Sequence, residues 1–181
     1  RLTRQEERRL LEAADADANP FVTPAVILAL ETAARRGELL SITPGDVFLD
    51  ERYVLLRETK NGRSRKVPLT KRALEVITAL MSDCTSDQEP LLNLTPNALK
   101  VAFFKRVIPA SGIQDLHFHD LRHTGQSLAM VKGANTKDLQ RRAGQSSEAA
   151  ARIYMHGSKV RDREVAESLS DYVNESLSMW R

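Results

Sequence analysis

The stretch that decides the fold runs from Arg52 to Leu69 and reads RYVLLRETKNGRSRKVPL. Its two halves, RYVLLRET and RSRKVPL, carry the β-branched and aromatic residues that favour strands. Asn61-Gly62 lies between them and is the strongest hairpin signal in the chain, because both central residues of a type I′ turn need a positive φ. Together with the preceding segment DVFL, this stretch predicts three antiparallel strands from about Asp46 to Leu69.

Helix signals flank this predicted sheet on both sides. Before it, Thr3 and Glu6 are spaced as a capping box for a helix over 4–14, and Pro24 begins an apolar helix that Gly37 interrupts. After it, Thr70 precedes the first of several segments with helical periodicity, which begin near residues 71, 96, 119, 136, 148 and 162. We therefore predict a mainly α domain with a small three-stranded antiparallel sheet, an α+β fold.

The composition excludes several classes of protein. The chain has 181 residues, 41% hydrophobic and 28% charged, which suits one ordinary globular domain. No apolar stretch approaches the length of a transmembrane helix, so no membrane partner is expected. The only cysteine, Cys84, excludes an internal disulfide and indicates a reducing compartment. The net charge of +3 and a pI near 9.2 lean mildly towards a polyanionic partner.

Four segments place residues with useful chemistry at the ends of predicted elements, and each one alone also fits a structural role. Arg35 and Arg36 follow an apolar helix, where cations stabilise the helix C-terminus. The basic residues around the hairpin turn suit either contact with phosphates or protection of an edge strand. Tyr154 lies in GQSSEAAARIYMHGSK, and a lone tyrosine on a helix of small residues is usually a packing residue.

The remaining segment, HFHDLRHT, combines histidines with an arginine. His119 and Arg122 are three residues apart and share one helix face. His119 and His123 have a zinc-like spacing, but HDLRH lacks the glutamate of HExxH, and Arg122 would put a fixed cation beside the metal. An arginine beside a histidine suits an anion better, because the guanidinium forks onto two oxygens while the imidazole handles a proton. We expect no metal and no cofactor.

Taken together in this order, Arg35, Lys60, His119, Arg122 and Tyr154 resemble the catalytic domain of the tyrosine recombinases, the phage-integrase family. The resemblance spans nearly the whole chain, and HDLRHT followed by RIYMH is its specific part. It implies site-specific recombination or integration of double-stranded DNA through a 3′-phosphotyrosyl intermediate, without metal or ATP. It also implies a cytoplasmic protein of a bacterium or phage.

The resemblance implies a role for each matching residue. Arg35 and Arg122 would clamp the non-bridging oxygens of the phosphate, which stabilises the charge of the transition state. Lys60 would protonate the leaving 5′-oxygen, and His119 would assist proton transfer from the hydroxyl of Tyr154, the nucleophile.

Two further positions complete the predicted site. Glu38 matches an acidic residue that supports the catalytic groups. Gln145 departs from the family, which usually has histidine and less often tryptophan after the glycine. Gln145 can donate a hydrogen bond to a phosphate oxygen but cannot carry a proton, so we expect activity to be retained, at full or reduced rate. The basic residues predicted to meet DNA phosphates are Arg63, Arg65, Lys66, Lys100, Lys105, Arg141 and Arg142.

Residues 1–181 are predicted to form one catalytic domain, with a core over about 1–160 and a C-terminal helix within 161–181. That helix would pack either on its own domain or on a neighbouring protomer of a homotetramer on DNA, the free protein being a monomer or weak oligomer. Because the chain opens on Arg1 rather than Met, we expect an N-terminal DNA-binding domain outside this sequence. Two alternatives stay open: a protein of this fold that binds DNA without cutting it, and a type IB topoisomerase.

Overall fold

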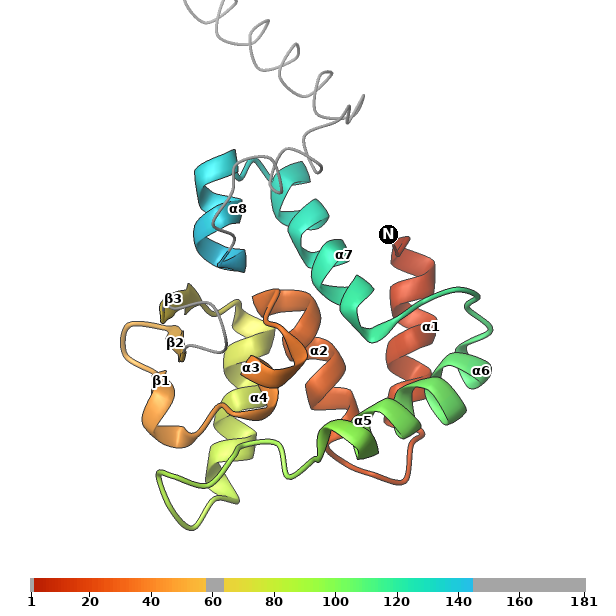
Figure 1. Cartoon of the computed structure of the whole chain (residues 1–181), viewed down its shortest axis with the longest axis horizontal. Helices are drawn as coiled ribbons and strands as arrows, with labels where there is room; N and C mark the ends of the chain where they lie inside the picture. The colour runs from red at the N-terminus through yellow and green to blue at the C-terminus, as the bar shows by residue number, and fades with distance from the viewer. Residues whose placement is uncertain (1, 58–63, 145–181) are drawn as a thin grey trace, which may run out of the picture.

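The computed structural model describes residues 2–57 and 64–144 of the chain (Figure 1). Over these ranges the α+β prediction is confirmed, since the chain forms mostly helices and one three-stranded antiparallel sheet of order β1-β2-β3. The segments 1, 58–63 and 145–181 lie outside the described residues. They include the predicted hairpin turn, the C-terminal helix and four residues of the predicted site, Lys60, Arg63, Gln145 and Tyr154.

Of the helices before the sheet, α1 (Arg4–Asp15) begins as predicted, whereas α2 (Val22–Thr32) begins two residues before the predicted Pro24 and ends earlier than predicted. α1 starts at the expected capping box, in which the Thr3 hydroxyl accepts a hydrogen bond from the Glu6 amide at 3.2 Å. α2 does not continue to the two arginines, because Ala33 adopts a left-handed conformation with φ 53°. The Thr32 hydroxyl accepts from the amide of Ala34 at 3.2 Å and so closes the helix end.

The sheet follows a short α3 (Arg36–Leu40) and η1 (Pro44–Asp46). It consists of β1 (Val47–Phe48), β2 (Tyr53–Leu56) and β3 (Arg65–Pro68), with Val54 opposite Val67 in the β2–β3 pair. Val54 and Val67 are fully buried, so one face of the sheet packs on the core. The prediction of three antiparallel strands is confirmed.

The second half of the described chain is helical. The elements are α4 (Lys71–Ser82), α5 (Pro96–Ala102), η2 (Phe103–Val107), α6 (Ile108–Ser111), α7 (Phe118–Val131) and α8 (Thr136–Ala143). The N-cap residues of α4, α5 and α8, which are Thr70, Thr95 and Asn135, each accept a hydrogen bond from the third residue of their helix. The single helix predicted from residue 96 is instead interrupted by the π-helical turn η2. No helix in the described part of the chain is long and apolar enough to span a membrane.

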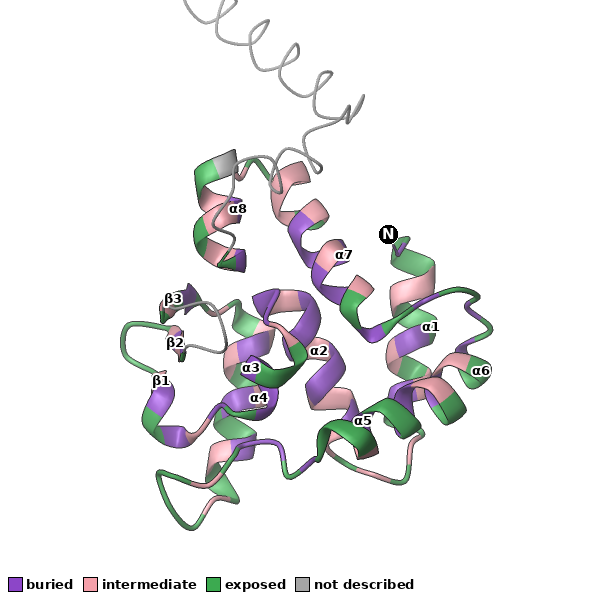
Figure 2. Ribbon diagram, in the orientation of Figure 1, coloured by how far each residue is buried: buried purple, intermediate pink, exposed green. Residues whose placement is uncertain are grey.

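The core is built around α2, which contacts α1, α3, α4 and α7 and is buried along most of its length (Figure 2). The crossing of α2 and α7 is unusually close at Gly125. A Cβ atom at Gly125 would lie 2.0 Å from the carbonyl oxygen of Leu30, so only glycine permits this approach. The crossing brings the first half of α7 against the C-terminal end of α2.

Candidate active site

The carboxylate of Glu38 is the centre of the candidate site. Its side chain is 2% exposed and accepts four hydrogen bonds. Arg35 donates to it through its backbone amide and through Nη1, both at 2.8 Å. Arg65 on β3 donates through Nη1 and Nη2 at 2.9 and 2.7 Å, a bidentate pair. Since a carboxylate has about four acceptor positions, all are occupied by these two arginines.

These contacts keep Glu38 ionised. Burial raises the pKa of the Glu38 carboxyl, but the hydrogen bonds and charge of Arg65 and the hydrogen bonds of Arg35 outweigh it and hold the pKa at about 2. The site therefore contains a permanent negative charge at neutral pH between two permanent positive charges. Its position follows from local structure, because Glu38 is the third residue of α3 and reaches back to the N-cap, Arg35.

Arg35 is the exposed member of this group. Its side chain is 38% exposed, and besides Glu38 it donates from Nη2 to the carbonyl oxygen of Gly144 at 3.2 Å. Gly144 ends α8 in a left-handed conformation with φ 62°. Arg35 is the N-cap of α3 and not a C-terminal cap of the preceding apolar helix, which corrects the structural alternative considered from the sequence.

Arg122 lies within the protein, at 4% exposure. Its guanidinium donates from Nη1 to the carbonyl oxygen of Ala33 and from Nη2 to that of Ala143 at 2.5 Å. These carbonyls lie at the C-terminal ends of α2 and α8, where the helix dipoles are negative. Arg122 therefore supplies the helix-end cation that the sequence suggested for Arg35 and Arg36, and it joins α7 to both helix ends.

His119 precedes Arg122 by one helical turn and is exposed. Its ring makes an edge-to-face contact with His123, at 4.9 Å between centroids. Although the residue is largely exposed, partial burial of the ring lowers the pKa of His119, and the positive charges of His123, Arg122 and Arg35 lower it further. Both predicted catalytic arginines therefore lie within electrostatic reach of His119, and its imidazole is neutral at neutral pH, the form that accepts a proton.

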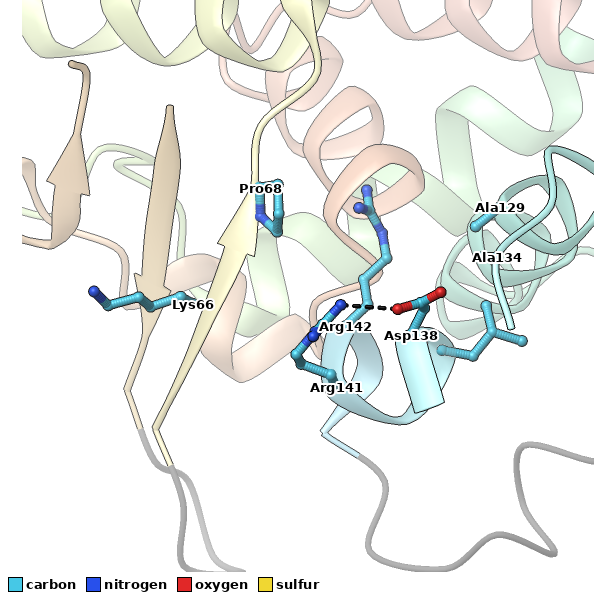
Figure 3. Close-up of a pocket in the computed structure, with 8 residues that line it drawn as sticks. Lys66, Pro68, Ala129, Ala134, Asp138, Arg141 and Arg142 are labelled. Carbon is cyan, nitrogen blue, oxygen red and sulfur yellow. Dashed lines mark hydrogen bonds and ion pairs between the residues drawn. The ribbon is translucent and has the colours of Figure 1, made fainter. Parts of the chain in front are cut away.

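A pocket of about 160 Å³ lies between β3 and α8 (Figure 3). Lys66 lines it from the strand and Arg141 from the helix, and Arg141 is paired with Asp138 at 2.8 Å. Lys66 also lies 4.4 Å from the centre of the Tyr53 ring, a cation–π contact. The charged residues that line this pocket are Lys66, Arg141, Arg142 and Asp138, so its lining is mainly basic.

The predicted DNA-binding residues divide into inward-facing and exposed sets. Arg65 and Arg142 face inward: Arg65 binds Glu38, and Arg142 donates to the carbonyl oxygen of Glu31. These bonds do not support the prediction that the two guanidinium groups meet phosphates. The exposed residues of the set are Lys66, Arg141, Lys100 and Lys105, the last two on α5 and η2 away from α8 (Figure 1).

Sequence reasoning missed the contact of Arg65 with Glu38, although strand alternation could have indicated it. Side chains two residues apart on a strand share a face, so Arg65 must point to the same side as the buried Val67. Reasoning from the sequence also missed Gly125, because a glycine within a helix carries no signal for the helix that crosses it. Among residues 2–57 and 64–144, no three His, Cys, Asp or Glu side chains are grouped so that they could hold a metal ion.

Comparison with known proteins shows which proteins this chain is similar to in sequence and in fold. The shufflon-specific DNA recombinase of Escherichia coli is 34% identical over 157 residues, which cover 86% of this chain and 40% of that relative. The chain thus spans well under half of its length. The crystal structure of XerA recombinase superposes with a TM-score of 0.74 at 24% identity, covering 92% of this chain and 62% of that one.

The Tn1549 transposon integrase gives a TM-score of 0.73 at 20% identity, covering 93% of this chain and 66% of that chain. At such identities these solved structures establish a shared fold. The model of the phage integrase family matches residues 1–161, a range that includes every helix and strand described above. This chain therefore belongs to the phage integrase family.

Proposed function

We propose that this chain is the catalytic domain of a tyrosine-type site-specific DNA recombinase. The observation that carries the proposal is the convergence of Arg35, Arg122 and His119 where α3, α7 and the end of α8 meet. Gly144, which Arg35 contacts, directly precedes the segment that contains Tyr154. A tyrosine hydroxyl is a weak nucleophile at neutral pH, and a neighbouring neutral imidazole and fixed cations are what it needs.

The proposed reaction conserves the energy of the phosphodiester. The Tyr154 hydroxyl gives its proton to His119, and its oxygen bonds to phosphorus while the bond from phosphorus to the 5′-oxygen breaks. Lys60 gives a proton to that leaving oxygen. Attack by another 5′-hydroxyl on the 3′-phosphotyrosyl bond reverses these transfers and joins a new pair of strands.

The arginines would stabilise the pentavalent transition state, in which negative charge grows on the non-bridging oxygens. Arg35 has the exposed guanidinium and the position beside Gly144 that this role requires. Arg122 is more buried and is bound at the C-terminal ends of α2 and α8. We therefore propose that its positive charge acts on the phosphate from the protein side of the site. Removal of one such donor typically costs about 10²–10³ in rate. Gln145 would contribute a neutral hydrogen bond.

We further propose that DNA lies across the face that carries His119, the hairpin and α8. Among proteins of this fold, the Tn1549 transposon integrase has been solved in complex with circular intermediate DNA. Lys66, Arg141 and Arg63 would contact phosphates near the scissile bond, and Lys100 and Lys105 would contact them further away. Neutralising one such contact should reduce the slope of log affinity against log salt by about 0.9.

A covalent trapping experiment tests the proposed function. A target duplex is selected by binding from a random-sequence pool, and a nick is placed next to the scissile phosphate so that the released fragment diffuses away. We expect the wild type to form a covalent complex that resists SDS, and Tyr154→Phe to bind the same duplex without forming it. Binding without any covalent complex would identify a non-cutting DNA-binding protein. Relaxation of supercoiled DNA by monomers, without strand exchange, would identify a topoisomerase.

Assembly and location are part of the same proposal. We propose a homotetramer on DNA, joined through the segment 161–181, acting in the cytoplasm of a bacterium. The predicted apolar stripe of that segment includes Leu169 and Val173. Leu169→Asp with Val173→Asp should abolish the tetramer in sedimentation of the DNA complex while the free protein stays folded. A variant that loses its fold instead would show that the segment packs on its own domain.

A further inference from the structure

We infer that Arg65 is a positioning residue for the proposed reaction: it neutralises Glu38, so that the positive charge of Arg35 stays available to the phosphate. This inference rests on the proposed function. It differs from the phosphate contact predicted for Arg65 from the sequence, because the Arg65 side chain is only 9% exposed and its guanidinium faces the protein.

The first observation that supports this role of Arg65 is the charge balance around Glu38. Arg35 and Arg65 each donate to both carboxylate oxygens of Glu38 at 2.7 to 2.9 Å, Arg35 through its backbone amide and Nη1, and Arg65 through Nη1 and Nη2. With both arginines present, the group carries one net positive charge, and it is located on the more exposed Arg35. Without Arg65, the buried carboxylate would pair with Arg35 alone, and the net charge that faces the phosphate would fall to zero.

The second observation that supports this role is the set of contacts that Arg65 makes with the backbone of α8. Its Nε donates to the carbonyl oxygen of Arg142 at 3.0 Å, in the last turn of α8. Its guanidinium also lies against Gly144, since a Cβ atom there would be 2.8 Å from Nη1 of Arg65. Arg65 thus joins β3 to the C-terminal end of α8, after which the sequence continues towards Tyr154.

A double-mutant cycle of Arg65 and Glu38 distinguishes this role from a merely structural one. Arg65→Met removes the cation and leaves the carboxylate, and Glu38→Gln removes the carboxylate charge. We expect Arg65→Met alone to weaken the binding of inorganic phosphate by about 10-fold or more. Binding is measured from the NMR chemical shift of the Arg35 side chain. The same substitution should slow covalent-complex formation by about 10- to 100-fold.

In the Glu38→Gln background the same change should have a much smaller effect. There is then no carboxylate to cancel the charge of Arg35, so we expect Arg65→Met to cost less than about threefold in phosphate binding. Arg65→Lys keeps the charge and should retain more phosphate affinity than Arg65→Met. If Arg65→Met weakens phosphate binding equally in both backgrounds, or leaves it unchanged, the inference is wrong.

Arg106→Met is the matched control. Arg106 on η2 makes a bidentate pair with the buried carboxylate of Asp17, in the loop after α1, at 2.6 and 3.0 Å. Its removal should lower stability in urea without changing phosphate affinity. Phosphate binding also separates this inference from the proposed function. A wild type that binds phosphate but forms no covalent DNA complex would refute the proposed function. The double-mutant cycle measured by phosphate binding would still test whether Arg65 keeps the charge of Arg35 available.

Discussion

Gly125→Ala gives the most direct test of how the crossing of α2 and α7 shapes the site. The added methyl would lie 2.0 Å from the carbonyl oxygen of Leu30 and 3.1 Å from its carbonyl carbon. Atoms in contact need at least 3 Å, and the opposing group is backbone, so it cannot rotate away. The two helices would have to move apart by about 1 Å, a displacement that well-packed cores resist.

The expected cost combines overpacking with a smaller gain. Forcing an extra methyl into a packed core typically costs about 1–3 kcal/mol and occasionally more, and because the contact here is with rigid backbone at 2.0 Å we take the cost as about 3–5 kcal/mol. Alanine regains about 1 kcal/mol relative to glycine within a helix. We expect a net loss of about 2–4 kcal/mol, which for this chain length lowers the melting temperature by about 4–16 °C.

The same displacement should reach the site. Arg122 lies three residues before Gly125 and donates to Ala33, three residues after Leu30, so the crossing sets the Arg122 contact directly. A misplacement of about 1 Å can cost about 10²-fold in rate. We therefore expect covalent-complex formation by folded Gly125→Ala to fall together with its stability.

Gly37→Ala is the matched control, because a Cβ atom at Gly37 would meet nothing within 4 Å. It should leave stability unchanged or raise it by up to about 1 kcal/mol. Urea unfolding of the two variants and the wild type measures the difference. Equal stability of Gly125→Ala and Gly37→Ala would refute the argument that backbone contact controls this crossing.

Gly144→Ala should lose about 1–3 kcal/mol in urea unfolding, because φ is 62° there and the new Cβ would lie 2.8 Å from the Arg65 guanidinium. Gln126→Leu should gain about 1–2 kcal/mol in the same assay, because this fully buried amide has no hydrogen-bond partner among the described residues; a loss would reveal a partner. The pKa of Glu38 falls from 4.5 to about 2 on folding, so its ionised form stabilises the protein by about 3 kcal/mol above pH 4.5. This contribution to the free energy of unfolding should disappear as the pH falls from 4.5 to about 2. In Glu38→Gln it should be absent at every pH. The cleavage rate should fall with acid only below pH 6.5, the ordinary pKa of histidine, because the pKa of His119 is lowered; an acid limb with its midpoint above pH 6.5 would contradict this.

The parts of the fold that were predictable are those with local causes. Strand composition and caps such as Thr3 and Thr70 act within a few residues, and they located the sheet and most helix starts. The end of α2 was not predictable, since it depends on Ala33 adopting a left-handed conformation that is typical of glycine. That conformation is held by the Thr32 hydroxyl and by Arg122, which is distant in sequence.

The motif predicts which residues form the candidate site, but it does not predict the contacts that the structure gives them. The motif identified Arg35, Glu38, His119 and Arg122, whereas their partners include the carbonyl oxygens of Ala143 and Gly144. Every residue has a carbonyl, so no side-chain pattern marks those that bind an arginine. The Arg65 contact had a signal in strand alternation, but a basic residue beside a hairpin turn equally suits DNA contact.

The placement of the three arginines explains how a buried site can stay positively charged. Arg65 is balanced by Glu38, and that pair adds no net charge. Arg122 is bound by two backbone carbonyls at helix C-termini, which offset the cost of burying a cation without cancelling its charge. Arg35 shares Glu38 but remains the most exposed of the three. In the contacts described, Glu38 pairs with both Arg35 and Arg65, so this group keeps one net positive charge, on Arg35, and under the proposed function that charge would face the phosphate.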